Sequence, residues 1–399
     1  MSQATIGRSR VTAALTAFLI VAGSAAVAND VGAVARTPFV SPPATSPTLA
    51  SPPEHTPDRM SIAQTETTDG RALEGTRTAA PCPGTLTANF TFTSDLTCNL
   101  DVTAPDVTVD LAGHTLFGRI HTTGGGTTIR NGTIDGASVA PFVGVVRTSS
   151  ALIDNIELRN GDTWAMVIGG GTVVQNSRFR DNASVVFDLF WGGGNVLRHN
   201  LFQNSGIPIS IQLDSDTRVE RNVFAGNQTA IILWPEHGGG VNNTLVRENV
   251  FLDNGTGIHM RGRRRMTPLP GENMANSQFL DNIFAGSDGP GMSLLFGDCG
   301  TGPQTEPCAG KNTTVRGNTF VFNGYGASEP GLDDGLHVSP DPEWAPNFTV
   351  SRNTALLNAD LGIEASGAID GGHNLGLFNG DRRQCVGVRC GPRWLLGWW

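Results

Sequence analysis

Residues 217–227 read TRVERNVFAGN, and residues 244–254 read TLVRENVFLDN. The two stretches share the template T-x-V-x-x-N-x-F-x-x-N, with central asparagines at Asn222 and Asn249. Self-similarity at a period of about 20 to 50 residues is typical of stacked repeats. The template therefore predicts a solenoid in which each copy forms one coil.

The template recurs along most of the chain. Its central position falls at His114, Gly132, Ile156, Ser177, Asn200, Asn222, Asn249, Ser277, Asn318, Asn353 and Asn374. Most copies lie about 22 residues apart, and longer steps indicate loop insertions. Between the copies lie apolar alternations such as Ile231 and Leu233, and period 2 is typical of strands. We therefore expect an all-β, right-handed parallel β-helix of about eleven coils.

Three columns of identical residues should line the coils and hold them together. The phenylalanines of one register should stack inside: Phe179, Phe202, Phe224, Phe251, Phe279 and Phe320. Two ladders of asparagine should fill corners, since Asn tolerates the left-handed backbone. They are Asn200, Asn222, Asn249, Asn318, Asn353 and Asn374, and Asn182, Asn227, Asn254, Asn323, Asn358 and Asn379.

Two further segments indicate a resemblance to a known protein family. Residues 107–116 read VTVDLAGHTL, and residues 379–390 read NGDRRQCVGVRC. With the repeat, they resemble the secreted bacterial right-handed β-helix repeat proteins of the pectate-lyase-like superfold, over about residues 82–391. The resemblance implies a fold that carries lyases, hydrolases, epimerases and inert adhesins. Fold alone does not choose among them.

The chain divides into four predicted regions. Residues 1–28 read as a secretory signal with Arg8 and Arg10 before an apolar run, and cleavage is expected after Ala28. Residues 29–80 are rich in Pro, Ser and Thr and predict a disordered linker. Residues 81–391 form the β-helix domain, and residues 392–399 are a hydrophobic tail. The protein is therefore expected to be secreted or extracellular.

The six cysteines fall in three close pairs. An even number of cysteines in an exported chain implies disulfides. Six cysteines allow fifteen pairings, and sequence distance favours the three local ones. The expected pairs are Cys82–Cys98, Cys299–Cys308 and Cys385–Cys390. The first and last would staple the ends of the solenoid, whose terminal coils lack a neighbour. No zinc site is expected, since no two pairs have the spacing of metal ligands.

One strand between template copies should carry the chemistry. Its apolar residues should face inward, so the residues between them should face outward. The outward candidates are Asp188, Gln212, Asp214, Ile232, Trp234, His259, Arg261, Ser293, His337 and Ser339. On the middle coils they predict a groove for a glycan.

Within that groove, candidates are assigned by their chemistry. Histidine titrates near neutral pH, arginine binds carboxylates, and tryptophan offers a flat apolar face to sugar rings. The catalytic candidates are His259, Arg261, His237, Asp188 and Asp214. The ligand-binding candidates are Trp191, Trp234, Glu236, Arg263, Arg264, Arg265 and His337.

The sequence leaves the function open between two classes. In one, the protein binds an acidic polysaccharide and cleaves or epimerises it. A lyase or C5-epimerase would use His259 as base and Arg261 to neutralise a carboxylate, whereas a glycoside hydrolase, which is less favoured, would need Asp188 and Asp214. In the other, it is a non-catalytic extracellular scaffold or adhesin. Residues 333–337 read DDGLH and resemble part of the polygalacturonase pattern, whose other motifs are absent.

Charge and composition limit the partners. The formal charge is −9, and it becomes −11 once the two arginines of residues 1–28 are removed with no acidic residue. An acidic chain is a poor partner for nucleic acid, and the apolar run is too short for a membrane span. No cofactor is expected. Calcium has weak support, because the nearby oxygen ligands are only Asp188, Asp214 and Asp216.

Overall fold

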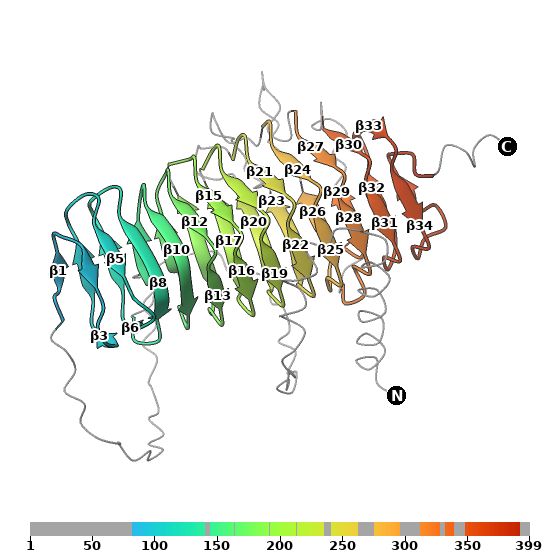
Figure 1. Ribbon diagram of the computed structural model, residues 1–399. Coiled ribbons are helices and arrows are strands. Elements are labelled where there is room, and N and C mark those ends of the chain that lie inside the picture. Colours follow the sequence, from blue (N-terminus) through green and yellow to red (C-terminus); the bar gives the residue numbers. More distant parts are fainter. Residues whose placement is uncertain are drawn as a thin grey trace, which may run out of the picture. The chain divides into compact units, whose positions relative to one another are not determined.

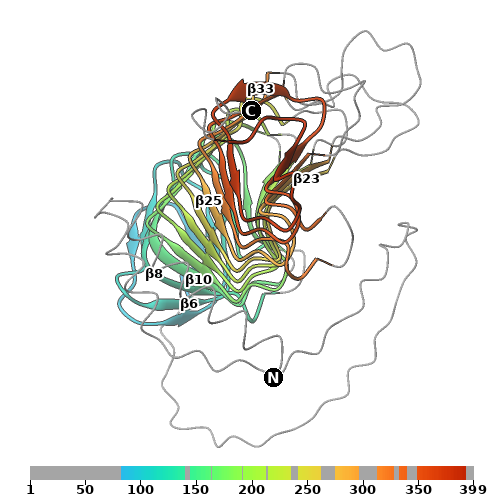
Figure 2. The ribbon, with the colours of Figure 1, turned by 90° about the vertical axis from the view of Figure 1, so that its right-hand side faces the viewer.

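The computed structural model describes residues 82–139, 144–162, 164–190, 192–212, 214–234, 241–261, 275–295, 312–327, 332–338 and 348–391. Within these ranges the regular elements are short β-strands that pair in parallel with the strands of the coils before and after. The coils follow one another along one axis (Figure 1). Viewed along that axis, they superpose, with β25 and β23 on separate walls (Figure 2). The described residues form a parallel β-helix.

The strands form three rows along the stack. Sheet A consists of β1 (Thr85–Leu86), β4 (Leu100–Val102), β7 (Ile120–Thr122), β9 (Val146–Thr148), β11 (Trp164–Ile168), β14 (Val185–Phe190), β17 (Ile207–Gln212), β20 (Thr229–Trp234), β23 (Thr256–Arg261), β26 (Met292–Leu295), β29 (Leu336–Val338), β32 (Ile363–Ala365) and β35 (Cys385–Val386). Row B consists of β2 (Phe90–Thr91), β5 (Thr108–Asp110), β8 (Thr128–Asp135), β10 (Leu152–Arg159), β12 (Val173–Gln175), β15 (Val196–Arg198), β18 (Arg218–Glu220), β21 (Leu245–Arg247), β24 (Gln278–Leu280), β27 (Thr314–Arg316), β30 (Thr349–Ser351) and β33 (Ile369–Gly372). Row C consists of β3 (Leu96–Thr97), β6 (Thr115–Phe117), β13 (Arg178–Arg180), β16 (Leu201–Gln203), β19 (Val223–Ala225), β22 (Val250–Leu252), β25 (Ile283–Ala285), β28 (Thr319–Val321), β31 (Thr354–Leu356) and β34 (Leu375–Leu377), while β8 and β10 run through both rows.

The coil count agrees with the repeat. The eleven template copies correspond to the coils that run from β4–β6 to β32–β34. The strands β1–β3 add a coil before them, and β35 pairs with β32 after them, so sheet A has 13 strands. The end strands carry no template, which is why the repeat alone does not reveal them.

A column of phenylalanine rings fills the interior. Phe202, Phe224 and Phe251 stack with ring centroids 4.8 Å apart, and Phe284 continues the column at 4.5 Å from Phe251. All four rings are fully buried. The prediction of this column is confirmed except for Phe279, which lies in row B and pairs with Val246. The ring in register is Phe284, five residues later.

The first asparagine ladder is also confirmed, with one correction. Asn282, and not Ser277, occupies the ladder position on the coil after Asn249. The Oδ1 of Asn282 accepts from the backbone N–H and from Nδ2 of Asn249, both at 3.0 Å. The side chain of Asn249 is fully buried, so these bonds satisfy polar groups that water cannot reach.

Disulfides lie near both ends of the described stack. Cys82 is bonded to Cys98, and Cys385 is bonded to Cys390, as predicted. The predicted pair Cys299–Cys308 lies outside the described residues, as do the predicted signal, linker and C-terminal tail. Within the described ranges no helix is long and apolar enough to cross a membrane.

Candidate active site on the outward face of sheet A

Strand register places one residue of each coil in a single column on sheet A, and the described side chains of this column face outward. From β4 to β32 the column runs Asp101, His121, Arg147, Val167, Asp188, Ser210, Ile232, His259, Ser293, His337 and Glu364. The apolar neighbours of these residues on the same strands point inward, and those that are described are buried, as predicted. Adjacent column residues are separated by one strand spacing, about 4.8 Å. Four polar residues in succession, from His259 to Glu364, distinguish its last part.

Three titratable side chains meet where β29 pairs with β32. His337 and Glu364 belong to the column, and Asp334 lies just before β29. His337 Nδ1 lies 3.0 Å from Asp334 Oδ2 and 2.9 Å from Glu364 Oε2. Asp334 precedes β29 by two residues and is fully buried, whereas the side chains of His337 and Glu364 are 12% and 25% exposed. The other oxygen of Asp334 accepts the backbone N–H of Leu361 at 2.9 Å. The imidazole is thus held by two carboxyl groups at one ring nitrogen.

The electrostatics of this cluster favour bound protons. Burial raises the pKa of Asp334 from its usual 3.8 to about 6, and its hydrogen bond with Glu364 acts in the same direction. Burial alone would lower the pKa of His337, but its hydrogen bond to Asp334 and the two carboxyl charges raise that pKa above its usual value. Perturbed titration in a group of contacting side chains is typical of acid–base sites.

Two more carboxyl groups flank the cluster. Burial and the charges of Asp333 and Asp381 raise the pKa of Asp360. The ligand atoms of Asp334, His337 and Glu364 all lie within 4.8 Å of one another, and so do those of Asp333, Asp334 and Asp360. Either set could hold a metal ion by geometry. The hydrogen bonds among the first three residues account for their closeness without one.

Of the twelve predicted catalytic and ligand-binding residues, only His259, Trp234, Asp214 and His337 have described side chains. His259 and Trp234 are both half-buried and lie on β23 and β20. For Arg261 and Asp188 only the position on the strand is described, with Arg261 opposite Leu295 and Asp188 opposite Ser210. The remaining predicted side chains lie outside the described residues: Trp191, Glu236, His237, Arg263, Arg264 and Arg265.

The expectation that Asp214 faces outward is wrong. Strand β17 ends at Gln212, so the alternation of faces no longer applies two residues later. Asp214 is fully buried in the corner that follows, where its Oδ2 accepts from Asn195 Nδ2 at 2.9 Å and from Thr217 Oγ1 at 2.8 Å. Burial raises its pKa. Asp214 therefore stabilises a corner and is not the outward carboxylate that was predicted.

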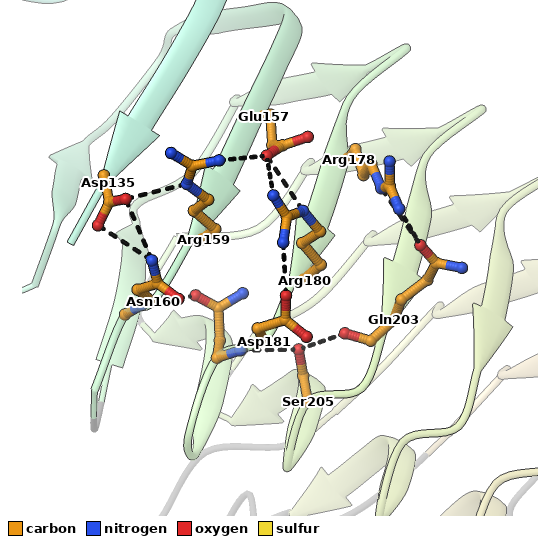
Figure 3. Close-up of polar contacts among 11 residues, drawn as sticks. Asp135, Glu157, Arg159, Asn160, Arg178, Arg180, Asp181, Gln203 and Ser205 are labelled. Atoms are coloured by element: carbon orange, nitrogen blue, oxygen red, sulfur yellow. Dashed lines mark hydrogen bonds and ion pairs between the residues drawn. The ribbon is translucent and has the colours of Figure 1, made fainter. Parts of the chain in front are cut away.

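The outward face of row C offers a contrast (Figure 3). Arg159 Nε binds Asp135 Oδ2 at 2.9 Å, and Arg180 Nη2 binds Glu157 Oε1 at 2.8 Å. Arg180 also binds Asp181 at 2.6 Å. The first two pairs join neighbouring strands, which is how side chains stabilise a sheet, and the third joins consecutive residues. The network has the features of a structural surface, which leaves the cluster on sheet A as the candidate active site.

The residues of that cluster can be seen in the sequence, but the sequence alone does not show that they lie close together. His337 was predicted to bind ligand, and Asp334 belongs to the noted DDGLH motif. Glu364 was missed. The available signal was that residues 336–338 and 363–365 share the pattern apolar, polar, apolar, which places His337 opposite Glu364 once the strands pair.

Comparison with known proteins agrees with the fold. Residues 119–272 match a family model described as a right handed beta helix region. None of the curated proteins compared with the chain matches it.

Several solved structures are similar to the chain. The A-module of the mannuronan C-5 epimerase AlgE6 of Azotobacter vinelandii is similar at 15% identity over 75% of this chain and 90% of that one, with a TM-score of 0.45. PfbA, a surface adhesin of Streptococcus pneumoniae, is similar at 13% identity over 69% and 78%, with a TM-score of 0.45. An exopolygalacturonase of Thermotoga maritima is similar at 11% identity over 71% and 82%, with a TM-score of 0.38.

Because enzymes and an adhesin stand together among these structures, the likeness concerns architecture and carries no argument about a reaction. The parallel strand pairing and the match of residues 119–272 identify the architecture. The described part of the chain is a right-handed parallel β-helix.

Proposed function

We propose that the protein binds a linear polysaccharide along the outward face of sheet A, between β20 and β32, and acts on it by proton transfer at His337. The observation that carries this proposal is the contact of His337 Nδ1 with both Asp334 and Glu364. A positioned imidazole is the commonest general acid or base, and carboxyl groups at one nitrogen leave the other for the substrate.

The shape of the column supports a polymer as ligand. Side chains recur about every 4.8 Å along the axis, so a linear chain lying on them would meet a new side chain at each coil. Trp234 on β20 lies three strands before His337, or about 14 Å along the axis. A half-buried tryptophan offers an apolar face on which a sugar ring can stack.

The charge of the polymer follows from two opposing features. The sequence favours an acidic polysaccharide because of Arg263, Arg264 and Arg265, which lie outside the described residues. Glu364, Asp333 and Asp360 make the surroundings of His337 acid-rich, so an anionic sugar is disfavoured at that position. The proposal is therefore a polymer whose reacting unit is uncharged and whose acidic units, where present, lie toward β23.

The test combines binding with product analysis. Wild type should bind one or more members of a panel of neutral and acidic polysaccharides in affinity electrophoresis. Mass spectrometry and NMR of the treated polymer record cleavage, unsaturation, epimerisation and loss of substituents alike. His337→Asn should abolish the product while binding remains.

His121→Asn is the matched control. His121 lies in the same column on β7 and pairs with one exposed carboxylate, Asp101, at 3.6 Å. It lies outside the proposed binding region, so its variant should behave as wild type. Absence of binding across the panel, or unchanged product from His337→Asn, would refute the proposal. Binding without any product would identify the non-catalytic scaffold instead.

We also infer that the protein is exported. Its two described disulfides are typical of oxidising compartments. The predicted signal at residues 1–28 agrees with this inference. N-terminal sequencing of protein recovered from the medium of an expressing culture should begin at Asn29, and a start at Met1 would contradict it.

A further inference from the structure

Ser293 has an unusual place in the outward column. It pairs in register with His259 on one side and with His337 on the other. The residue is 1% exposed, and its Oγ makes no hydrogen bond with any described residue. Buried hydroxyl groups are normally satisfied, so an unpaired one beside two imidazoles calls for a functional account.

The orientation of His337 supplies the second part of the argument. Its Nδ1 is held by Asp334 and Glu364. Glu364 lies on β32, whereas Ser293 lies on β26, at the opposite side of β29. Nε2 is therefore the ring nitrogen left to take a proton. Hydroxyl, imidazole and carboxyl groups in this order make up the arrangement that activates a nucleophilic serine, whatever the fold.

We propose that Ser293 is a nucleophile, that His337 is its general base, and that the substrate is an acyl ester. That the ester is carried by a polysaccharide rests on the proposed function above. Serine attacks acyl carbon readily once a base removes its proton. The acid-rich surroundings disfavour phosphate esters, which are anions, and favour departure of a carboxylate product.

The reaction balances with water as the second substrate. Oγ of Ser293 forms a bond to the ester carbonyl carbon, and its proton passes to Nε2 of His337. The ester C–O bond then breaks, and the alcohol of the sugar leaves with that proton. Water attacks the acyl-serine through the same base, which releases the carboxylic acid and restores the hydroxyl. His259 is the residue in register on the other side of Ser293.

The first test is covalent labelling with a fluorophosphonate, read by intact mass and peptide mapping. Wild type should gain one adduct on the peptide that contains Ser293, and Ser293→Ala should gain none. Ser210→Ala is the matched control, because Ser210 is also an outward residue of the column and 1% exposed. It differs in its neighbours, Asp188 and Ile232, and in accepting a hydrogen bond from Gln212 Nε2 at 2.9 Å. Equal labelling of Ser293→Ala and wild type, or no labelling of folded wild type, overturns the proposal.

The second test measures acetate release from O-acetylated xylan and hydrolysis of 4-nitrophenyl acetate. Ser293→Ala should lower both rates at least about 100-fold, and Ser210→Ala should leave them unchanged. Asp334 acts as a positioning residue, and it also raises the pKa of His337. The rate of Asp334→Asn should therefore reach its plateau at a lower pH than that of wild type. An unshifted profile would contradict this role of Asp334.

These outcomes separate the nucleophile from the polysaccharide. If wild type binds a polysaccharide but neither reacts with the fluorophosphonate nor releases acetate, the nucleophile is refuted and the proposed binding stands. If Ser293 hydrolyses 4-nitrophenyl acetate but the protein binds no polysaccharide, the nucleophile stands and the polysaccharide is refuted.

Discussion

Asn222 and Asn249 occupy the same corner of consecutive coils, and the Oδ1 of Asn249 accepts two hydrogen bonds from Asn222. The backbone N–H donates at 2.9 Å and Nδ2 donates at 3.1 Å. Nδ2 of Asn249 donates in turn to the carbonyl of Val219 at 2.8 Å. One side chain therefore satisfies backbone groups of its neighbours, which explains why the repeat specifies asparagine.

Removing this side chain should be costly. Asn249→Ala removes the partner of the buried backbone N–H of Asn222, one of the two bonds of its Nδ2, and the donor to the carbonyl of Val219, so we expect a loss of about 2–4 kcal/mol in the free energy of unfolding. Asn249→Ser should cost clearly less, because Ser177 and Ser205 occupy ladder positions in this protein. Urea denaturation of both variants measures the difference. Equal losses for Ala and Ser would mean that the hydrogen bonds are not the source of the effect.

The phenylalanine column predicts a second loss of stability. Phe224 stacks on Phe202 and Phe251 with centroids 4.8 Å away on either side. Phe224→Ala should lower the free energy of unfolding by about 3–5 kcal/mol, as for other buried aromatic residues. The comparison is Gln212→Ala on the outward face of sheet A, which should change the free energy of unfolding by no more than about 0.5 kcal/mol. Similar losses would show that the inward and outward faces are assigned wrongly.

The Asp334–His337 pair predicts a pH dependence of stability. The pKa of Asp334 rises from 3.8 to about 6, so the folded state holds this proton more tightly than the unfolded chain does. Its contribution to stability is present at low pH and is lost as pH rises from about 4 to about 6. The pKa of His337 is also raised, so its contribution is present below 6.5 and is lost at higher pH.

Asp334→Asn removes the titrating carboxyl group and also its effect on the pKa of His337, so both contributions fall in the variant. The stability advantage of wild type over the variant should shrink as pH rises from 4 to 7. Urea midpoints at several pH values measure it. An advantage that stays constant or grows with pH would contradict the raised pKa of Asp334.

The network in Figure 3 predicts the effect of removing one charge. Arg159 and Arg180 are paired directly in register, and like charges in that position repel each other. Glu157 Oε1 binds both, at 3.4 and 2.8 Å. Glu157→Gln should cost about 1 kcal/mol at low salt, and less at high salt because salt screens both arginines. A loss that does not depend on salt would indicate packing as the cause.

The sequence predicts the architecture because each coil repeats the same requirements. Asparagine at a buried corner and phenylalanine at an inward position recur in one register, so the template carries the fold. The template assigns one phenylalanine to the wrong row, and the spacing of the strands explains why. Phe279 and Phe284 are five residues apart, which is also the spacing between the row B and row C positions of one coil. A copy shifted by five residues therefore places Phe279 where Phe284 belongs.

The candidate site was less predictable, because it depends on contacts across coils of irregular length. His337 and Glu364 lie 27 residues apart in the sequence and meet only through the pairing of β29 with β32. Asp334 precedes its strand, so no alternation rule places it. Asp214 is a second case in which strand alternation cannot be used. It was expected to face outward, but it follows the end of β17 and is buried.

The most direct measurement of the central claim is a crystal structure of the His337→Asn variant with an oligosaccharide identified by the binding panel. The account predicts that the sugar lies along the outward face of sheet A. One ring should contact the side chain at position 337, and another should lie over Trp234. A sugar bound instead to the outward face of row C, around Glu157 and Arg180, would contradict the account.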